Sequence, residues 1–329
     1  MRQIIKTIIQ TFSITFFCNL TFATEAKTEF ITKVTDIKGN PKSVEQTHYK
    51  AVNLTDTVII EDIDYNFFSE FTKKGDITVS IRYDSKCNLL EKTTFLYNRN
   101  NCLSKVSSYD LDENIRWQRI YIYNKKRQLI EREDICKDNS CYEKEIYKYI
   151  NNVTYVYFYD IDGKLKYYNT HEKGSQKKEE ILYSSEGKPI SKKLYDFDNN
   201  GKIVRFRRYY VPENNLQDEY IYEYDNKGNL LVMYSPNDSF IENRKTTYKY
   251  NDRGYLSEHA WQNYDANYKV TYSYDNSGNI IEELHFRNEN LYERTLYKYD
   301  TKGNWIEKTV YENNNLMKVI KRKIDYYNK

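Results

Sequence analysis

A short motif that ends in glycine recurs along the chain, and it constrains the fold more than any other feature of the sequence. Four copies align without gaps over residues 222–230, 248–256, 272–280 and 297–305. Each copy has two tyrosines two positions apart, then Asp or Asn, then a glycine four residues after the second tyrosine. The second tyrosines, at 224, 250, 274 and 299, follow one another at intervals of 26, 24 and 25 along the chain. Such regular spacing indicates a repeat architecture.

Weaker copies extend the repeat toward the N-terminus. Residues 157–165, 182–187 and 197–203 keep an aromatic residue and the glycine. Degenerate copies without the glycine are 14, 12 and 14 residues apart and begin at Tyr83, Tyr97, Tyr109 and Tyr123. Their spacing is about half of the longer period.

The glycines indicate what each motif does. Eight of the ten stand four residues after an aromatic residue: Gly75, Gly163, Gly187, Gly201, Gly228, Gly254, Gly278 and Gly303. Asp, Asn, Ser or Thr follows the aromatic residue, as a type I turn favours at its first position, and glycine suits the positive φ at the end of the turn. A type I turn closed in this way is a common hairpin connection. Each motif is therefore predicted to be a strand, a tight turn and a second strand.

The segments beside the turns have the alternation typical of strands. In residues 220–224 and 268–274, apolar and aromatic residues alternate with other residues. One full period of the motif leaves room for two strands and a second turn. We predict an all-β fold, a long antiparallel meander of β-hairpin repeats with about 20 strands that forms a twisted or curled sheet. Its terminal strands are expected to remain exposed edges, which the lysine-rich segment 318–323 protects from pairing.

Tyrosine takes the place of an aliphatic core. Of 329 residues 36 are Tyr, while all hydrophobic residues together make up only 39%. Equivalent tyrosines in successive repeats are expected to stack in ladders that bury their rings and leave their hydroxyls in water. The formal net charge of +3 is too small to indicate a nucleic-acid partner.

The first residues are typical of an export signal. Arg2 and Lys6 precede an apolar stretch, and Thr-Phe-Ala at 21–23 forms a small-residue exit. We predict a signal peptide over 1–23 and a single repeat domain over 24–329, weakly matching at 79 and before and most regular over 222–327. The protein is then exported to the periplasm, the outer surface or the medium. An uncleaved membrane anchor is the alternative, but polar residues interrupt the apolar stretch.

Four cysteines remain after such cleavage. Cys136 and Cys141 enclose a turn-like tetrapeptide and are predicted to face each other across a hairpin mouth. Cys87 and Cys102 are then expected to pair between neighbouring turns. An even number of cysteines in an exported chain is compatible with two disulfides. A zinc site and free thiols are the alternatives, and no histidine stands beside either pair.

The motif resembles that of the RHS or YD-repeat family of bacterial secreted and cell-surface proteins. The hallmark of that family, Tyr-Asp-x-x-Gly-Asn/Arg-Leu, is similar to residues 224–230, 274–280 and 299–305, and the resemblance covers roughly residues 80–327. It implies surface recognition or adhesion and, in large members, a β-shell around a toxin. This chain departs from the family in its longer period, and it is too short for a closed shell of that kind.

The sequence contains no recognisable catalytic or cofactor motif. The four histidines are scattered, and there is no phosphate-binding glycine loop, Gly-x-Ser-x-Gly motif or His-Glu-x-x-His motif. Residues 196–203 match the first half of a calcium loop, but the twelfth position is Arg207 instead of a bidentate Glu, which favours another repeat turn. We expect a protein that is not an enzyme and holds no cofactor or metal.

A binding role is the main hypothesis. Aromatic rings on a rigid sheet suit sugars or peptides, and the candidate ligand-binding residues are Trp261, Trp305, Tyr224, Tyr250, Tyr274 and Tyr299. A structural role in the ladder is the competing interpretation of the tyrosines. We predict an exported repeat protein that presents a Tyr-rich β surface to a protein or glycan of the bacterial envelope. The alternatives are a toxin-associated or enzymatic element and an envelope scaffold. Charges such as Arg205, Arg207 and Arg208 on both strand faces argue against a membrane barrel.

Overall fold

The computed structural model describes residues 37–54, 57–137, 140–174, 176–236, 244–263 and 265–328. The predicted signal peptide over 1–23 lies outside the described residues. All regular elements of the described part are strands. Their bounds are β1 Pro41–Leu54, β2 Thr57–Phe71, β3 Ile77–Tyr83, β4 Leu89–Tyr97, β5 Leu103–Tyr109, β6 Ile115–Tyr123, β7 Leu129–Cys136, β8 Glu143–Ile150, β9 Val153–Tyr159, β10 Leu165–Lys173, β11 Lys177–Ser184, β12 Pro189–Phe197, β13 Ile203–Tyr210, β14 Asn215–Tyr224, β15 Leu230–Ser235, β16 Arg244–Tyr250, β17 Leu256–Gln262, β18 Asn267–Tyr274, β19 Ile280–Arg287, β20 Asn290–Tyr299, β21 Trp305–Glu312 and β22 Asn315–Tyr326.

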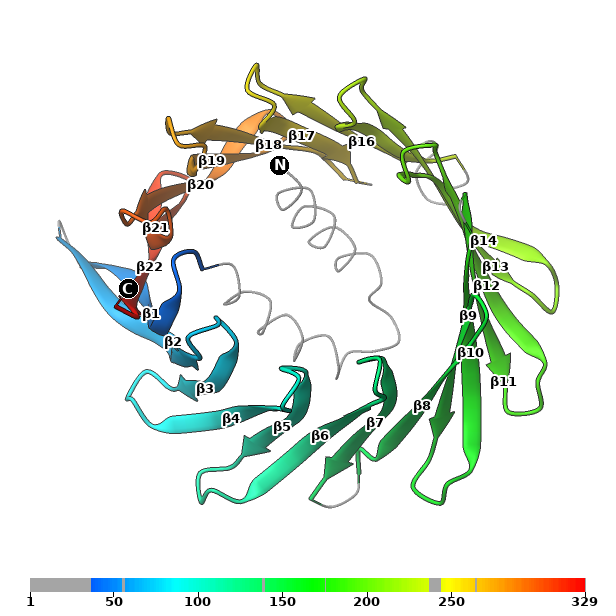
Figure 1. The fold of residues 1–329 in the computed structure, drawn as a ribbon. Helices are drawn as coiled ribbons and strands as arrows, with labels where there is room; N and C mark the ends of the chain where they lie inside the picture. The colour runs from blue at the N-terminus through cyan, green and yellow to red at the C-terminus, as the bar shows by residue number, and fades with distance from the viewer. Residues whose placement is uncertain are drawn as a thin grey trace.

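The strands form one antiparallel sheet that closes on itself. Each strand pairs with the next, and β1 also pairs with β22, from Pro41 opposite Tyr326 to Lys50 opposite Lys318. Figure 1 shows the resulting ring, in which the blue N-terminal strands lie beside the red C-terminal strand. The predicted all-β hairpin meander is confirmed, with 22 strands.

The expectation of an open sheet with two exposed edges is wrong. The lysine-rich segment of β22 lies inside the hydrogen-bonded ladder, where Lys321 faces Thr47 and Lys323 faces Glu45 of β1. A long twisted sheet can satisfy both of its edges at once by joining them, and a barrel does so. Closure therefore protects the terminal strands, and the lysines are not needed for that purpose.

The glycine-containing turns are as predicted. All eight motif glycines have positive φ. At Gly228 the amide donates to the carbonyl of Asp225 at 2.8 Å, and the Asp225 side chain accepts the amide of Asn229 at 2.7 Å. In the degenerate copies other residues take the same left-handed conformation, namely Cys87, Asn101, Glu113 and Arg127. The hairpin geometry thus persists where the glycine is lost.

Successive turns lie at opposite ends of the barrel, because each strand crosses the wall once. One end, which we call the tyrosine rim, carries the turns at 72–76, 98–102, 124–128, 198–202, 225–229, 251–255, 275–279 and 300–304. The other end, the opposite rim, carries those at 84–88, 110–114, 160–164 and 184–188. A return to the same rim takes two strands, which explains why the full motif recurs at about twice the spacing of the degenerate copies.

This alternation decides which cysteines meet. Cys136 and Cys141 form a disulfide at the mouth of the β7–β8 hairpin, with a Cα–Cα distance of 5.4 Å, as predicted. The expected Cys87–Cys102 disulfide is wrong, because both thiols are free. Cys87 lies at the opposite rim and Cys102 at the tyrosine rim, so the nine residues of β4, about 30 Å of strand, separate them.

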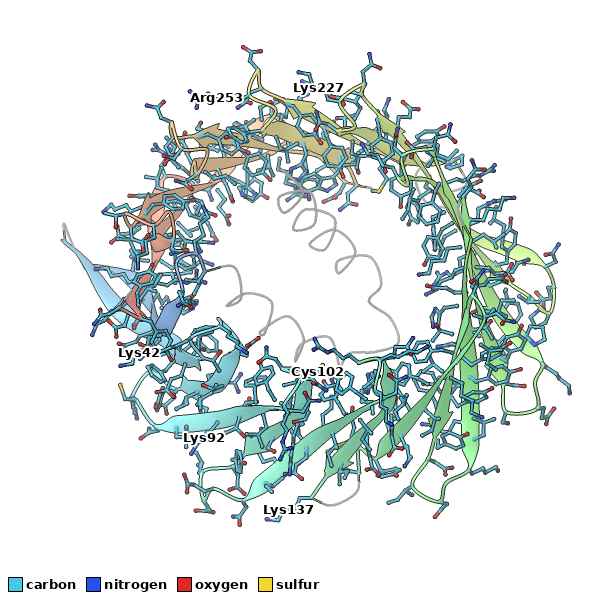
Figure 2. All side chains as sticks on the ribbon, viewed as in Figure 1. Lys42, Lys92, Cys102, Lys137, Lys227 and Arg253 are labelled. Carbon is cyan, nitrogen blue, oxygen red and sulfur yellow. A yellow bond between two sulfur atoms is a disulfide. The ribbon has the colours of Figure 1, made fainter. Side chains whose placement is uncertain are left out.

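Side chains alternate between an inner and an outer face of the wall. Lys92 of β4 lies outside the ring in Figure 2. Phe95 and Tyr97 are an odd number of residues away on the same strand, so their side chains are on the inner face. Nearly all buried apolar side chains are on the inner face, because curvature crowds them together. The main buried cluster joins Val44, Phe71, Ile77, Phe95 and Val106.

The outer face is rich in ion pairs between neighbouring strands. Lys249 pairs with Glu258 at 2.7 Å, and Lys298 pairs with Glu307 at 2.6 Å. Such pairs are typical of a face in contact with water. In the described part of the chain, no helix is long and apolar enough to cross a membrane.

Candidate functional site on the inner wall

The second tyrosine of each motif fixes one strand to its neighbour at the tyrosine rim. Its hydroxyl donates a hydrogen bond to the carbonyl of the first residue of the preceding strand, at 2.6–2.9 Å. The pairs are Tyr224 with Ile203, Tyr250 with Leu230, Tyr274 with Leu256 and Tyr299 with Ile280. Three upstream tyrosines make the same bond: Tyr97 with Ile77, Tyr123 with Leu103 and Tyr149 with Leu129.

These tyrosines have a structural role whatever else they do. Burial raises the pKa of Tyr224, Tyr250, Tyr274 and Tyr299 to about 12, so each keeps the proton that it donates. We call this bond the tyrosine latch. Sequence reasoning missed it because the acceptor is a backbone carbonyl some 20 residues away. Ligand binding by these four residues stays a prediction.

The strand registers place all three tryptophans of the chain on the inner face: Trp117 is opposite Ser108, Trp261 opposite Thr246 and Trp305 opposite Tyr299. Trp117 packs against the main buried cluster. Trp261 stacks on Tyr268 across the β17–β18 pair at 5.3 Å and on His259 at 5.0 Å. Trp305 lies under the guanidinium of Arg322, 3.5 Å from the ring centre. Trp261 and Trp305 are half-buried, so both keep surface for a ligand.

A polar and aromatic cluster extends from Trp261 across β17 to β20. His259 accepts or donates a hydrogen bond with the Tyr272 hydroxyl at 3.1 Å, and burial lowers its pKa to about 4. Glu283 accepts a hydrogen bond from the Tyr297 hydroxyl at 2.9 Å. His285 lies 3.6 Å from Glu283. The prediction of scattered histidines misses this cluster. His259 and His285 are separated by one repeat period, and this spacing is the sequence signal that they share a face.

Elsewhere the inner wall carries paired charges. Arg119 makes two hydrogen bonds of 2.6 Å to Asp134, and Arg132 lies 2.7 Å from the buried carboxylate of Glu145. Burial opposes ionisation of Glu180, but hydrogen bonds from His171 and Lys178 hold its pKa down to about 2. These ion pairs make this part of the wall polar.

The described residues include no His, Cys, Asp or Glu cluster suited to a metal ion. The calcium-loop-like segment is a repeat turn, as preferred from the sequence. The carboxylate of Asp198 accepts the amides of Asn200 at 2.9 Å and Lys202 at 2.8 Å, like the other motif aspartates.

No protein-family model and no curated protein matches the chain. It is similar to a chain in the crystal structure of TcdB2-TccC3-Cdc42, with 12% identity and a TM-score of 0.31, over 88% of this chain and 20% of that one. It is also similar to a porin-like protein from Bacteroides uniformis, with 10% identity and a TM-score of 0.31, over 87% and 98%. A third similar structure is a protein of unknown function from Bacteroides fragilis, with 12% identity and a TM-score of 0.28, over 32% of this chain and 91% of that one. The chain spans a fifth of the first of these, and likenesses this low carry no argument about function.

Proposed function

We propose that this chain is an exported, non-enzymatic binding protein of the RHS or YD-repeat type, and that the inner wall of its barrel takes up a protein or glycan of the bacterial envelope. The placement of all three tryptophans on the inner face carries the proposal. Tryptophan is the side chain most enriched in binding hot spots, and ligand sites combine aromatic surface with a few oriented polar groups. Family membership rests on the motif alone.

The neighbourhood of Trp261 supports this role. Its ring is held by two stacking partners, so little entropy is lost when a ligand packs against it. His259, Tyr272 and Glu283 supply hydrogen-bonding groups beside the ring. The outer face, with its ion pairs, suits contact with water. Export remains part of the proposal and rests on the sequence of residues 1–23.

Intrinsic tryptophan fluorescence tests the proposal, because every tryptophan reports from the inner wall. The purified protein is titrated with envelope polysaccharides, peptidoglycan fragments and outer-membrane protein extracts. A ligand of the inner wall shifts the emission, and W261F and W305F weaken its binding while the outer-face variant Y109F does not. Binding unaffected by either tryptophan substitution contradicts the proposal.

A further inference from the structure

A second aromatic surface lies on the outer face and is independent of the inner wall. Tyr157 of β9, Tyr168 of β10 and Tyr183 of β11 stack across three neighbouring strands, with ring centres 5.4 and 4.6 Å apart. Tyr155 continues the stack along β9. Figure 1 shows these strands at the right of the ring. We call this surface the outer tyrosine ladder.

Cations stand at both ends of the ladder. The ammonium of Lys148 on β8 lies 4.9 Å from the ring centre of Tyr157. Lys192 on β12 lies in the same hydrogen-bonded row, which runs from Lys148 through Tyr155, Thr170 and Ile181. Four strand spacings separate the two lysines, about 19 Å. The row therefore suits an elongated ligand that lies across the strands.

A shallow pocket adjoins the ladder on the same face. Its volume is about 230 Å³, and its outer-face lining residues are Lys177, Glu179, Leu194, Asp196 and Arg207. Residues 177, 179, 181 and 183 alternate along β11, so pocket and ladder are continuous. A ligand along the ladder can place a substituent in this pocket.

The pocket offers an unused donor. The Nε of Arg207 is buried and has no hydrogen-bond partner among the described residues, while its Nη2 pairs with Asp196. A buried donor left unpaired costs free energy that an acceptor on a ligand recovers. Around the pocket, four cations face four carboxylates: Lys177, Lys192, Arg205 and Arg207 against Glu172, Glu179, Asp196 and Glu219. The preference for a charged acceptor comes from the donor itself, because a hydrogen bond from a guanidinium to an ionised acceptor is stronger than one to a neutral acceptor.

We propose that the outer face of β9–β13 binds an acidic polysaccharide, with one carboxylate accepting the Arg207 Nε–H and the sugar chain lying along the outer tyrosine ladder. A polysaccharide fits better than an acidic peptide. Every strand from β9 to β13 already has a partner on both sides, so an extended peptide finds no edge to join by strand addition. Sugar rings instead contact aromatic side chains and hydroxyls, which the ladder supplies.

Calorimetric titration with oligogalacturonate, which carries a carboxylate on every ring, tests the site. We expect saturable binding that weakens as sodium chloride is raised, and at least about tenfold weaker binding in R207Q. D196N releases Arg207 from its ion pair and strengthens binding, an effect that a purely structural arginine does not produce. R294Q is the matched control, since Arg294 is an outer-face arginine paired with Glu282 at 2.8 Å, far from the pocket.

Several results overturn the site. Among them are no binding of oligogalacturonate, equal binding of maltodextrin of the same length, and R207Q folded by circular dichroism with unchanged affinity. Equal or tighter binding of poly-L-glutamate shows that the ligand is an acidic peptide and not a polysaccharide. A shift of tryptophan emission on binding shows that the ligand binds at the inner wall and not at the outer face. If R207Q does not fold, the affinity of D196N for oligogalacturonate is the test. Unchanged affinity in D196N also overturns the site.

Discussion

At the scale of single residues, the tyrosine latches hold neighbouring strands together at the tyrosine rim. Within the described part of the chain, Tyr327 extends the set of latches across the closure, where its hydroxyl donates to the carbonyl of Phe71 at 2.6 Å. Asn304 adds a second clasp there. Its buried side chain accepts the amide of Lys38 at 2.7 Å and donates to the carbonyl of the same residue at 2.9 Å.

Removing one latch tests its energetic role. Y250F keeps the ring but loses the hydrogen bond to Leu230, so we expect the free energy of unfolding to fall by about 1 kcal/mol. Urea denaturation followed by circular dichroism measures the change. Y183F, on the outer face, is the control and is expected to change it by less than about 0.5 kcal/mol. Equal effects of the two substitutions contradict a special role for the latch.

Two turn residues with positive φ allow substitutions whose expected effects on stability have opposite signs. Gly254 has φ +79° and open space around its Cα, so G254A introduces only backbone strain and is expected to destabilise by about 1 kcal/mol. Arg127 has φ 61° at the equivalent place, so R127G relieves strain and raises the midpoint of thermal unfolding. A lower midpoint in R127G shows that the arginine makes a compensating contact.

Burial of His259 predicts a pH-dependent stability. Its pKa, about 4 when folded, lies below the value of 6.5 expected in the unfolded chain. Between these two pH values the unfolded state binds more protons than the folded state. The contribution of His259 to the free energy of unfolding is therefore full above pH 6.5 and is lost as pH falls toward 4. We expect H259F to lose less stability than the natural protein between pH 7.5 and 4.5, by on the order of 2–3 kcal/mol. Parallel pH dependences in urea denaturation contradict this assignment.

At the scale of elements, local signals were enough to predict the hairpins but not the partners of their side chains. Asp225 and Gly228 specify a turn through bonds within five residues. Cys87 and Cys102 look alike in sequence, yet their separation depends on which rim each turn reaches. The same parity puts the Tyr or Phe before each of the tyrosine-rim turns named above on the inner face and residues such as Tyr109 and Tyr183, before opposite-rim turns, on the outer face.

The β7–β8 hairpin has a short ladder that the disulfide supports. Only four residue pairs join these strands, from Glu131 opposite Ile146 to Asp134 opposite Glu143. Reduction of Cys136–Cys141 releases a six-residue loop, which by chain entropy costs about 2 kcal/mol. We expect faster hydrogen exchange in β7 and β8 after reduction and unchanged exchange in β18 and β19. Uniform acceleration around the ring contradicts a local effect.

At the scale of the whole molecule, closure is what the sequence could not predict. The pairing of β1 with β22 joins residues nearly 300 positions apart, and β1 carries no copy of the motif. The candidate site depends on closure too, because only the curved ring gives the three tryptophans a shared inner side. Trp261 and Trp305 were selected from the sequence, whereas Trp117 and the two histidines were not.

Breaking the seam tests closure. Lys321 lies in β22 with its side chain on the outer face, opposite both Thr47 and Glu307, so K321P disrupts the ladder without removing a buried side chain. We expect the opened edges to pair between molecules and to produce larger species in analytical ultracentrifugation. K321A keeps the ladder and is expected to match the natural protein. A monomeric K321P shows that the seam does not keep the molecules apart.

The chain enters and leaves the barrel at one end, where the amide of Tyr327 reaches the carbonyl of Asn40 at 3.3 Å. This meeting requires an even tally of wall crossings. A gene duplication that inserts one full period adds two strands and preserves the junction. An insertion of half that length adds one strand and leaves the two ends of the sheet at opposite rims. Growth or shrinkage of this architecture in evolution is therefore quantised in steps of two strands.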